Sequence, residues 1–164
     1  MLMDERNEFA DNVSVAAAAG TALIGDVIDL DPTEISPNNT TDLYGSELYV
    51  VIRTGATEII TGGSAGTIQF YVVSDALATL GAGVVASCTT HLISPSLVTD
   101  DSAANSDALN AGGTILCAKL PPGNYERYLG VLCTIGTTTV TAGTIDAFLT
   151  ADPAIWKPFA DNVA

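Results

Sequence analysis

Short apolar runs alternate with turn-forming residues along most of the chain. Three runs, at residues 48–53, 67–73 and 128–135, are rich in β-branched and aromatic side chains. Such runs are typical of strands, and the Gly, Pro, Asn and Asp clusters between them are typical of turns. Further strands are expected at 22–30, 85–93, 114–120 and 138–149, with a weaker one at 13–19, where alanine favours a strand less. The pattern predicts about eight strands and little helix.

The spacing of these strands also predicts the domain organisation. A chain of 164 residues suits one domain, and about eight antiparallel strands in one domain favour a jelly roll or a related sandwich. We therefore expect an all-β, antiparallel jelly-roll sandwich over residues 1–164, with a core at about 12–150 and irregular terminal arms at 1–11 and 151–164. The Gly-rich segment 61–66 lies between two predicted strands and indicates a hairpin turn.

The two terminal arms carry large apolar side chains outside any strand pattern. Two prolines in the second arm block a regular strand or helix there. Large side chains on irregular segments need a surface to bury against, which is either the domain itself or a neighbouring subunit, because aromatic residues are favoured interface anchors. The predicted interface residues are Leu2, Met3, Phe9, Ile155, Trp156 and Phe159.

A five-residue segment occurs twice. Phe9-Ala10-Asp11-Asn12-Val13 recurs as Phe159-Ala160-Asp161-Asn162-Val163. No longer repeat accompanies it, so the match is either a coincidence or a sign that both ends of the chain make similar contacts, side by side.

The charge of the chain narrows the classes of partner. Lys and Arg number 5 against 19 Asp and Glu, which gives a net charge of −14. Without a basic cluster, binding to nucleic acid or to an anionic membrane is not expected. No apolar run reaches the roughly 18 residues of a membrane span, and the first residues lack the cationic region of a secretory signal.

Candidate chemistry is sparse. The one histidine, His91, follows Cys88 by three residues, and in a strand that spacing places the two side chains on opposite faces, which disfavours a thiol–imidazole pair. A zinc site lacks paired ligands. The acidic stretch from Asp26 to Glu34 lacks the glycine and terminal glutamate of a calcium loop. We therefore expect no catalytic residues, no metal and no cofactor.

The three cysteines, Cys88, Cys117 and Cys133, are far apart and form no CxxC pair. Cys117 and Cys133 lie in β-rich runs, and free cysteine is among the most buried residue types. Buried, reduced thiols are expected, as in a protein made in the cytoplasm.

Five short motifs occur in a characteristic order. They are Met1-Leu2-Met3-Asp4, Pro121-Pro122, Glu126-Arg127-Tyr128-Leu129-Gly130, residues 142–150, and Asp152-Pro153 with Trp156. Together they resemble a family of phage capsid cement proteins whose type member comes from a Bordetella phage. The likeness spans essentially the whole chain in length and element order.

The resemblance implies a jelly-roll domain on the outer surface of an HK97-type shell and transfers no catalytic residue. It implies that the chain bridges neighbouring major capsid proteins and associates with itself, a dimer being favoured over a trimer. The implied location is the outside of the virion, after synthesis in the cytoplasm of the bacterial host. Many weak contacts repeated around a shell would add up through multivalency.

Two other classes of function compete with this interpretation. A host-facing carbohydrate-binding sandwich would present aromatic platforms, whereas the one tryptophan, Trp156, lies in the terminal arm. A small hydrolase is disfavoured by the missing dyad. Two binding assays separate the carbohydrate-binding sandwich from the cement protein: the first should bind a glycan array, and the second should bind empty capsids.

Overall fold

The computed structural model describes residues 7–30, 47–62, 66–100 and 105–153. These residues contain eleven strands and no α-helix. The strands are β1 (Glu8–Ser14), β2 (Gly20–Asp29), β3 (Tyr49–Thr54), β4 (Ile60–Thr61), β5 (Gly66–Asp75), β6 (Thr89–Ile93), β7 (Leu97–Thr99), β8 (Thr114–Lys119), β9 (Tyr128–Gly136), β10 (Val140–Ala142) and β11 (Thr144–Thr150). No described helix is long and apolar enough to cross a bilayer.

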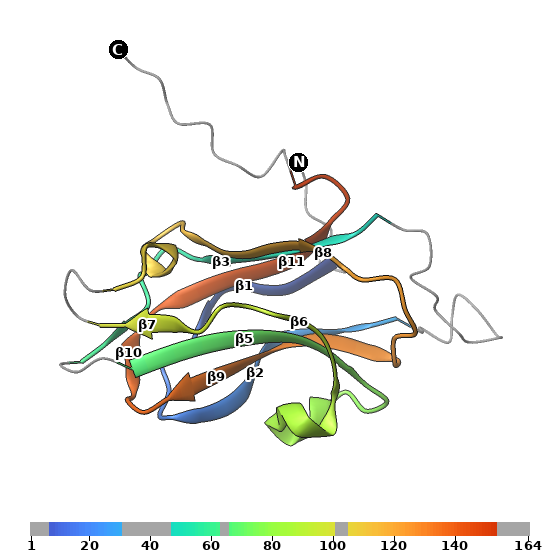
Figure 1. Cartoon of the computed structure of the whole chain (residues 1–164), viewed down its shortest axis with the longest axis horizontal. Coiled ribbons are helices and arrows are strands. Elements are labelled where there is room, and N and C mark those ends of the chain that lie inside the picture. The colour runs from blue at the N-terminus through green and yellow to red at the C-terminus, as the bar shows by residue number, and fades with distance from the viewer. Residues whose placement is uncertain (1–6, 31–46, 63–65, 101–104, 154–164) are drawn as a thin grey trace, which may run out of the picture.

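The strands form two main layers, one above the other in Figure 1. One sheet has the order β1-β11-β3-β8 and the other β2-β9-β5-β6, with β7 also paired to β5 and with β10 and β4 forming a separate pair. All of these pairings are antiparallel. The expected all-β antiparallel sandwich is confirmed. Successive strands largely alternate between the two sheets, an order compatible with the expected jelly roll.

Several strands and one turn differ from the expectation. The first strand covers 8–14 instead of 13–19, so residues 8–11 are regular structure and not part of an arm. Residues 85–87 form a 3-10 turn, η3 (Val85–Ser87), before β6. The expected strand 138–149 divides at Gly143, because its φ of +140° redirects the chain between β10 and β11. The segment 61–66 joins β4 to β5, which pair with different partners, so the hairpin was wrong.

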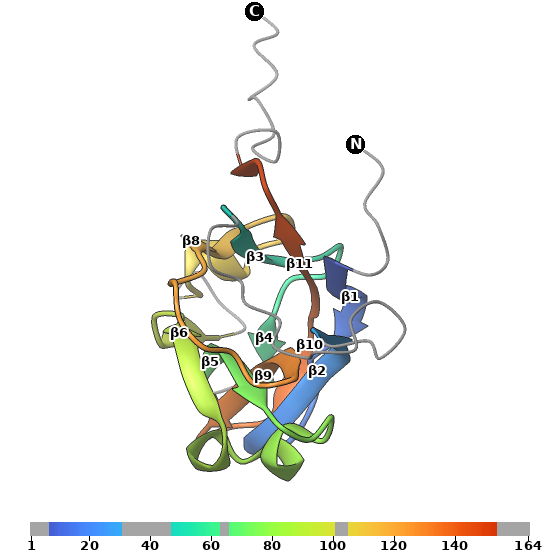
Figure 2. The same cartoon turned by 90° about the vertical axis from the view of Figure 1, so that its right-hand side faces the viewer.

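The main core lies between the two sheets, which Figure 2 shows edge on. Its largest fully buried members include Phe9, Ile52, Phe70, Leu129 and Ile145, from five different strands. Residues at alternate positions of β11 and β3 face this core, as the period of two in a strand requires. Burial of such side chains stabilises each by roughly 1.5–3 kcal/mol.

A second apolar cluster covers the other face of the larger sheet. Leu80, in the 3-10 turn η2 (Leu80–Gly83), packs on Val73 and Leu132. Gly130 of β9 makes this approach possible, because a Cβ there would lie 2.3 Å from Leu80 Cδ1. The larger sheet is therefore buried on both faces near η2, which explains the near-continuous apolar run of β9.

The cysteines occupy three different environments. All three are free thiols; Cys133 is buried, Cys88 is half-buried, and Cys117 on the edge strand β8 is exposed. The expected burial was therefore wrong for Cys117, which lies on a strand with a partner on one side only.

Thiol labelling is expected to follow this order. Burial raises the pKa of Cys133 to about 12, which leaves roughly a thousandfold less reactive thiolate than an ordinary thiol has. In native protein at mildly alkaline pH, mass spectrometry after iodoacetamide treatment should find the label on Cys117 and none on Cys133 until denaturant is added. Equal native labelling of both residues would contradict the packing of β9.

Candidate interaction surfaces

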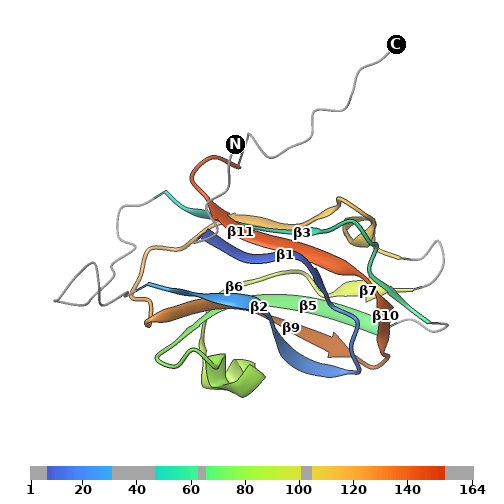
Figure 3. The same cartoon turned by 180° about the vertical axis from the view of Figure 1, so that it is seen from behind.

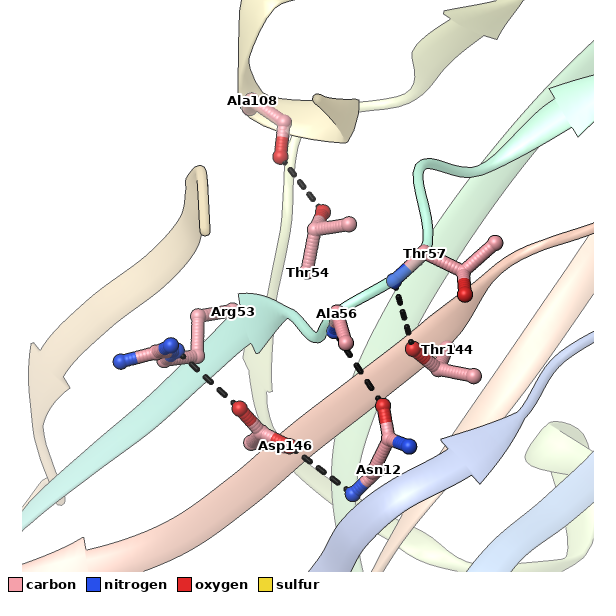
Figure 4. A network of polar contacts seen from close by, with 8 residues as sticks. All are labelled: Asn12, Arg53, Thr54, Ala56, Thr57, Ala108, Thr144 and Asp146. Atoms are coloured by element: carbon pink, nitrogen blue, oxygen red, sulfur yellow. Dashed lines mark hydrogen bonds and ion pairs between the residues drawn. The ribbon is translucent and has the colours of Figure 1, made fainter. Parts of the chain in front are cut away.

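A polar cluster ties three strands of the smaller sheet together (Figure 4). The Asp146 carboxylate of β11 accepts the backbone N–H of Asn12 at 2.8 Å and pairs with Arg53 Nε at 3.1 Å. We call Asn12, Arg53 and Asp146 the Asp146 clamp. It joins β1 and β3 to the strand between them, and its charged pair is mostly screened from water.

The connection after β3 is fixed beside the Asp146 clamp. The Asn12 side-chain oxygen accepts the N–H of Ala56 at 3.2 Å, and Thr144 Oγ1 accepts the N–H of Thr57 at 3.1 Å. Asn12 has a φ of +49°, a conformation that asparagine tolerates better than most residues. These groups hold the backbone of the connection in place.

The Glu126–Gly130 motif makes a second clamp. Arg127 donates from Nε and Nη2 to the two carboxylate oxygens of Asp29, at 3.0 and 2.8 Å, and its guanidinium carbon lies 5.0 Å from the centre of the Tyr128 ring. This two-point pairing joins the end of β2 to the start of β9. Asp29 is 98 residues away from Arg127 in the sequence, so the local pattern gave no sign of this partner.

His91 pairs with a serine rather than with Cys88. Its Nε2 lies 2.8 Å from Ser74 Oγ, and its ring stacks on Tyr125 at 4.0 Å. Ser74 is fully buried and also accepts the N–H of Glu126, so its hydroxyl is not presented to a substrate. Cys88 Sγ lies 3.9 Å from Asp75 Oδ2, and burial together with Asp75 raises its pKa, the opposite of an activated thiol.

His91 should make stability depend on pH. Burial lowers the pKa of His91 from its ordinary value of 6.5. At pH values between the lowered pKa and 6.5, the unfolded chain therefore binds a proton at His91 that the folded chain does not. The stability tied to the neutral ring is complete above about pH 6.5 and is lost as the pH falls toward the lowered pKa. The melting temperature of wild type should therefore fall more than that of His91→Gln between about pH 7 and pH 5. Parallel curves would contradict this assignment.

A groove of about 320 Å³ lies beside β2, lined by residues 14–15 and 17–24 with Cys133 and Ile135. No aromatic ring or charged group lines it, so it offers neither a sugar platform nor an acid–base pair. Among the described residues, no group of three or more His, Cys, Asp and Glu side chains is placed to hold a metal ion.

The large exposed apolar side chains of the described residues lie on edge strands of the larger sheet and in the connections around η2. Leu77, 65% exposed, and Val84 flank η2, while Ile93 and Val98 lie on the edge strands β6 and β7. Exposed apolar side chains beside a sheet edge are a candidate surface for a protein partner.

The predicted interface residues divide between the core and the undescribed ends. Phe9 is 1% exposed in β1 and packs in the main core, so its assignment to an irregular arm was wrong. The sequence could not distinguish the two, because an isolated apolar residue looks the same at the start of a strand and in an arm. Leu2, Met3, Ile155, Trp156 and Phe159 lie outside the described residues.

The described ends of the chain lie together at one end of the smaller sheet. Strand β1 runs antiparallel to β11, with Glu8 opposite Phe148 and Ser14 opposite Thr144. Figures 1 and 3 show the two strands side by side from opposite sides of the molecule. The segments before β1 and after β11 therefore start from neighbouring points, while the second copy of the pentapeptide, at 159–163, lies outside the described residues.

Comparison with known proteins places this fold in a family. No curated protein matches the chain. The family model Bbp16 matches residues 9–149 of the 164 residues, which includes both main sheets almost entirely and the two clamps. The family name suggests a protein of a Bordetella phage, in keeping with the resemblance drawn from the motifs. The chain belongs to the Bbp16 family.

Proposed function

We propose that this chain is a structural virion protein that binds the outer surface of an HK97-type phage capsid. In this role it bridges major capsid proteins and stabilises the shell, as a homo-oligomer and most simply a dimer, without catalysing a reaction. The observation that carries the proposal is the family match, which covers the folded sandwich from β1 to β11.

The chemistry of the described residues supports a mechanical role. The two clamps and the Ser74–His91 pair hold strands together, and the serine is buried. The net charge of −14 suits a protein that faces away from packaged DNA and meets a basic or mixed protein surface. Each sheet contains a charged pair between two of its strands, Arg53–Asp146 in the smaller and Arg127–Asp29 in the larger, and such pairs favour the rigid body that a bridging protein needs.

Two surfaces compete for the capsid contact. One consists of the terminal segments, with Leu2, Met3 and Trp156, which start from neighbouring points at the end of β1 and β11. The other is the exposed apolar surface near η2, with Leu77 and Val84. We assign the contact to the terminal segments, because a tryptophan anchor contributes about 2 kcal/mol or more at an interface.

The experiment is sedimentation of purified protein with capsids that lack it. Wild type should co-sediment and saturate a fixed number of sites per shell. The variant Leu2→Ala/Met3→Ala/Trp156→Ala should bind at least about 30-fold more weakly, and the matched variant Leu77→Ser/Val84→Ser should bind as wild type. The reverse pattern would move the contact to the surface near η2.

Absence of binding by wild type would overturn the proposal itself. The carbohydrate-binding alternative predicts that outcome together with binding to a glycan array, so the same preparation distinguishes the two functions.

A further inference from the structure

The edge strands of the two main sheets differ in charge. The strand orders place β1 and β8 at the edges of the smaller sheet and β2 and β6 at the edges of the larger one. Charged side chains occur on three of these edges: Glu8 and Asp11 in β1, Asp26 and Asp29 in β2, and Lys119 in β8. Strand β6 has no Asp, Glu, Lys or Arg. Charges on an edge strand discourage another strand from pairing with it, so β6 is the edge of the described main sheets that lacks this protection.

The side chains of β6 are open to solvent. Thr89, Thr90 and Ile93 are exposed, Ile93 by 54%. In the pairing with β5, Ile93 lies opposite Tyr71. Thr90 lies opposite Val73, and both Tyr71 and Val73 belong to the second apolar cluster, on the outer face of the larger sheet. Because paired residues lie on the same face, Thr90 and Ile93 present β-branched side chains on that outer face.

The neighbouring edge strand β7 is covered, whereas β6 is not covered in this way. The Val98 N–H donates to Ser106 Oγ at 3.2 Å, and the Val98 carbonyl accepts the Ser106 N–H, also at 3.2 Å. The segment that holds Ser106 therefore lies along β7. Strand β6 has β5 as its one strand partner among the described strands, and Figure 2 shows it at the side of the larger sheet.

Contacts on its inner side hold β6 in a fixed position. His91 Nε2 lies 2.8 Å from Ser74 Oγ, and the His91 ring stacks on Tyr125. Directly after the strand, Gln69 Nε2 donates to the Ser94 carbonyl at 2.9 Å. An edge that is already ordered loses little conformational freedom when a partner strand pairs with it.

We propose that β6 is the surface through which two copies of this chain associate. The two β6 strands pair antiparallel across a two-fold axis, so that the two larger sheets become one continuous sheet, and Ile93 of each copy is covered by the other. This inference rests on the self-association in the proposed function and assigns it to a strand. Because its test uses no capsid, its failure leaves the capsid contact of the terminal segments untouched.

The distribution of charge selects a second copy as the partner. A basic partner is attracted to the acidic surfaces of the chain and has no reason to prefer an uncharged edge. A second copy carries the same net charge of −14 and is repelled wherever carboxylates face one another, so it approaches most easily at β6. Each copy uses the same strand in a two-fold pair, which closes the assembly at a dimer.

The test is sedimentation velocity of the full chain between about 1 and 200 µM. Wild type should show a reversible monomer–dimer equilibrium in this range. Ile93→Glu should weaken dimerisation at least about 30-fold, because the two-fold axis places the new carboxylate in the interface twice. Its circular dichroism spectrum should match that of wild type, since the replaced side chain is exposed in the single chain.

Leu77→Glu is the matched control. Leu77 is 65% exposed and lies in the same uncharged stretch, residues 76–99, but outside β6. This variant adds the same charge and should dimerise as wild type does. Raising the salt concentration from about 0.02 M to about 0.3 M should tighten the wild-type dimer, because screening weakens the repulsion between two acidic chains.

Four results would overturn the proposal. Wild type could stay monomeric up to the highest concentration, or Ile93→Glu could dimerise as tightly as wild type. Equal weakening by Leu77→Glu would move the contact to the surface near η2, and a dimer that salt weakens would be held by ion pairs instead. If Ile93→Glu gives no folded protein, Thr90→Glu takes its place and is judged in the same way.

Discussion

Gly25→Ala is expected to lower the free energy of unfolding by about 4 kcal/mol or more. Gly25 interrupts β2 where its register against β9 shifts, with a φ of +63°. An added Cβ would stand 1.9 Å from the Phe9 carbonyl oxygen, which belongs to backbone. The left-handed conformation costs an alanine about 1–2 kcal/mol, and the remainder comes from pushing β1 away from β2. Urea unfolding measures the loss.

Gly112→Ala is the matched control for that prediction. Gly112 also has a positive φ, +77°, but no heavy atom lies within 4 Å of its added Cβ. Only the conformational cost of about 1–2 kcal/mol should appear. If Gly25→Ala and Gly112→Ala lowered the free energy of unfolding equally, β1 and β2 would lie further apart than they do in the structure.

Asp146→Ala should lower the free energy of unfolding by about 3 kcal/mol. The change removes the ionic partner of Arg53 and the acceptor of the Asn12 N–H together. Hydrogen bonds to charged groups contribute about 1.5–3 kcal/mol each, and partial exposure of the pair places the expected loss at the lower end of what two such bonds would give. Asp146→Asn keeps one acceptor and should lose less in the same denaturant titration.

Glu47→Ala removes a carboxylate that is also paired, with Lys119 at 3.0 Å, but the Glu47 side chain is 78% exposed. Glu47→Ala should therefore lower the free energy of unfolding by less than about 0.5 kcal/mol. The contrast tests whether burial and the bond to β1, and not the ion pair as such, give Asp146 its importance. Similar losses at Asp146 and Glu47 would contradict that view.

The fold class followed from the local pattern of residues, and so did the boundaries of some strands but not of others. Tyr49–Thr54 and Tyr128–Gly136 were predicted almost to the residue, since β-branched runs between turn residues have one simple interpretation. The first strand was misplaced, because Phe9 and Ala10 have the apolar character of either a strand or an arm. The short strands β4 and β7 have two and three residues, which is too few to show the alternation of apolar and polar residues that marks a strand.

The surfaces were less predictable than the strands, because they depend on contacts between distant residues. Arg127 and Asp29 are 98 positions apart, and Ser74 and His91 are 17 apart, so no local motif joins either pair. Within the Glu126–Gly130 motif, Arg127 joins β2 to β9 through Asp29. The duplicated pentapeptide was visible in the sequence, but only its first copy lies within the described residues, where it forms part of β1.

Cryo-electron microscopy of capsids saturated with the purified chain tests the central claim most directly. The account predicts a two-layered β-sandwich on the outer surface of the shell, seated where neighbouring major capsid proteins meet, with the end of the smaller sheet that holds the starts of both terminal segments directed toward the shell. Shells without added density, or density for the sandwich on the inner surface beside the DNA, would contradict a role as an external structural protein.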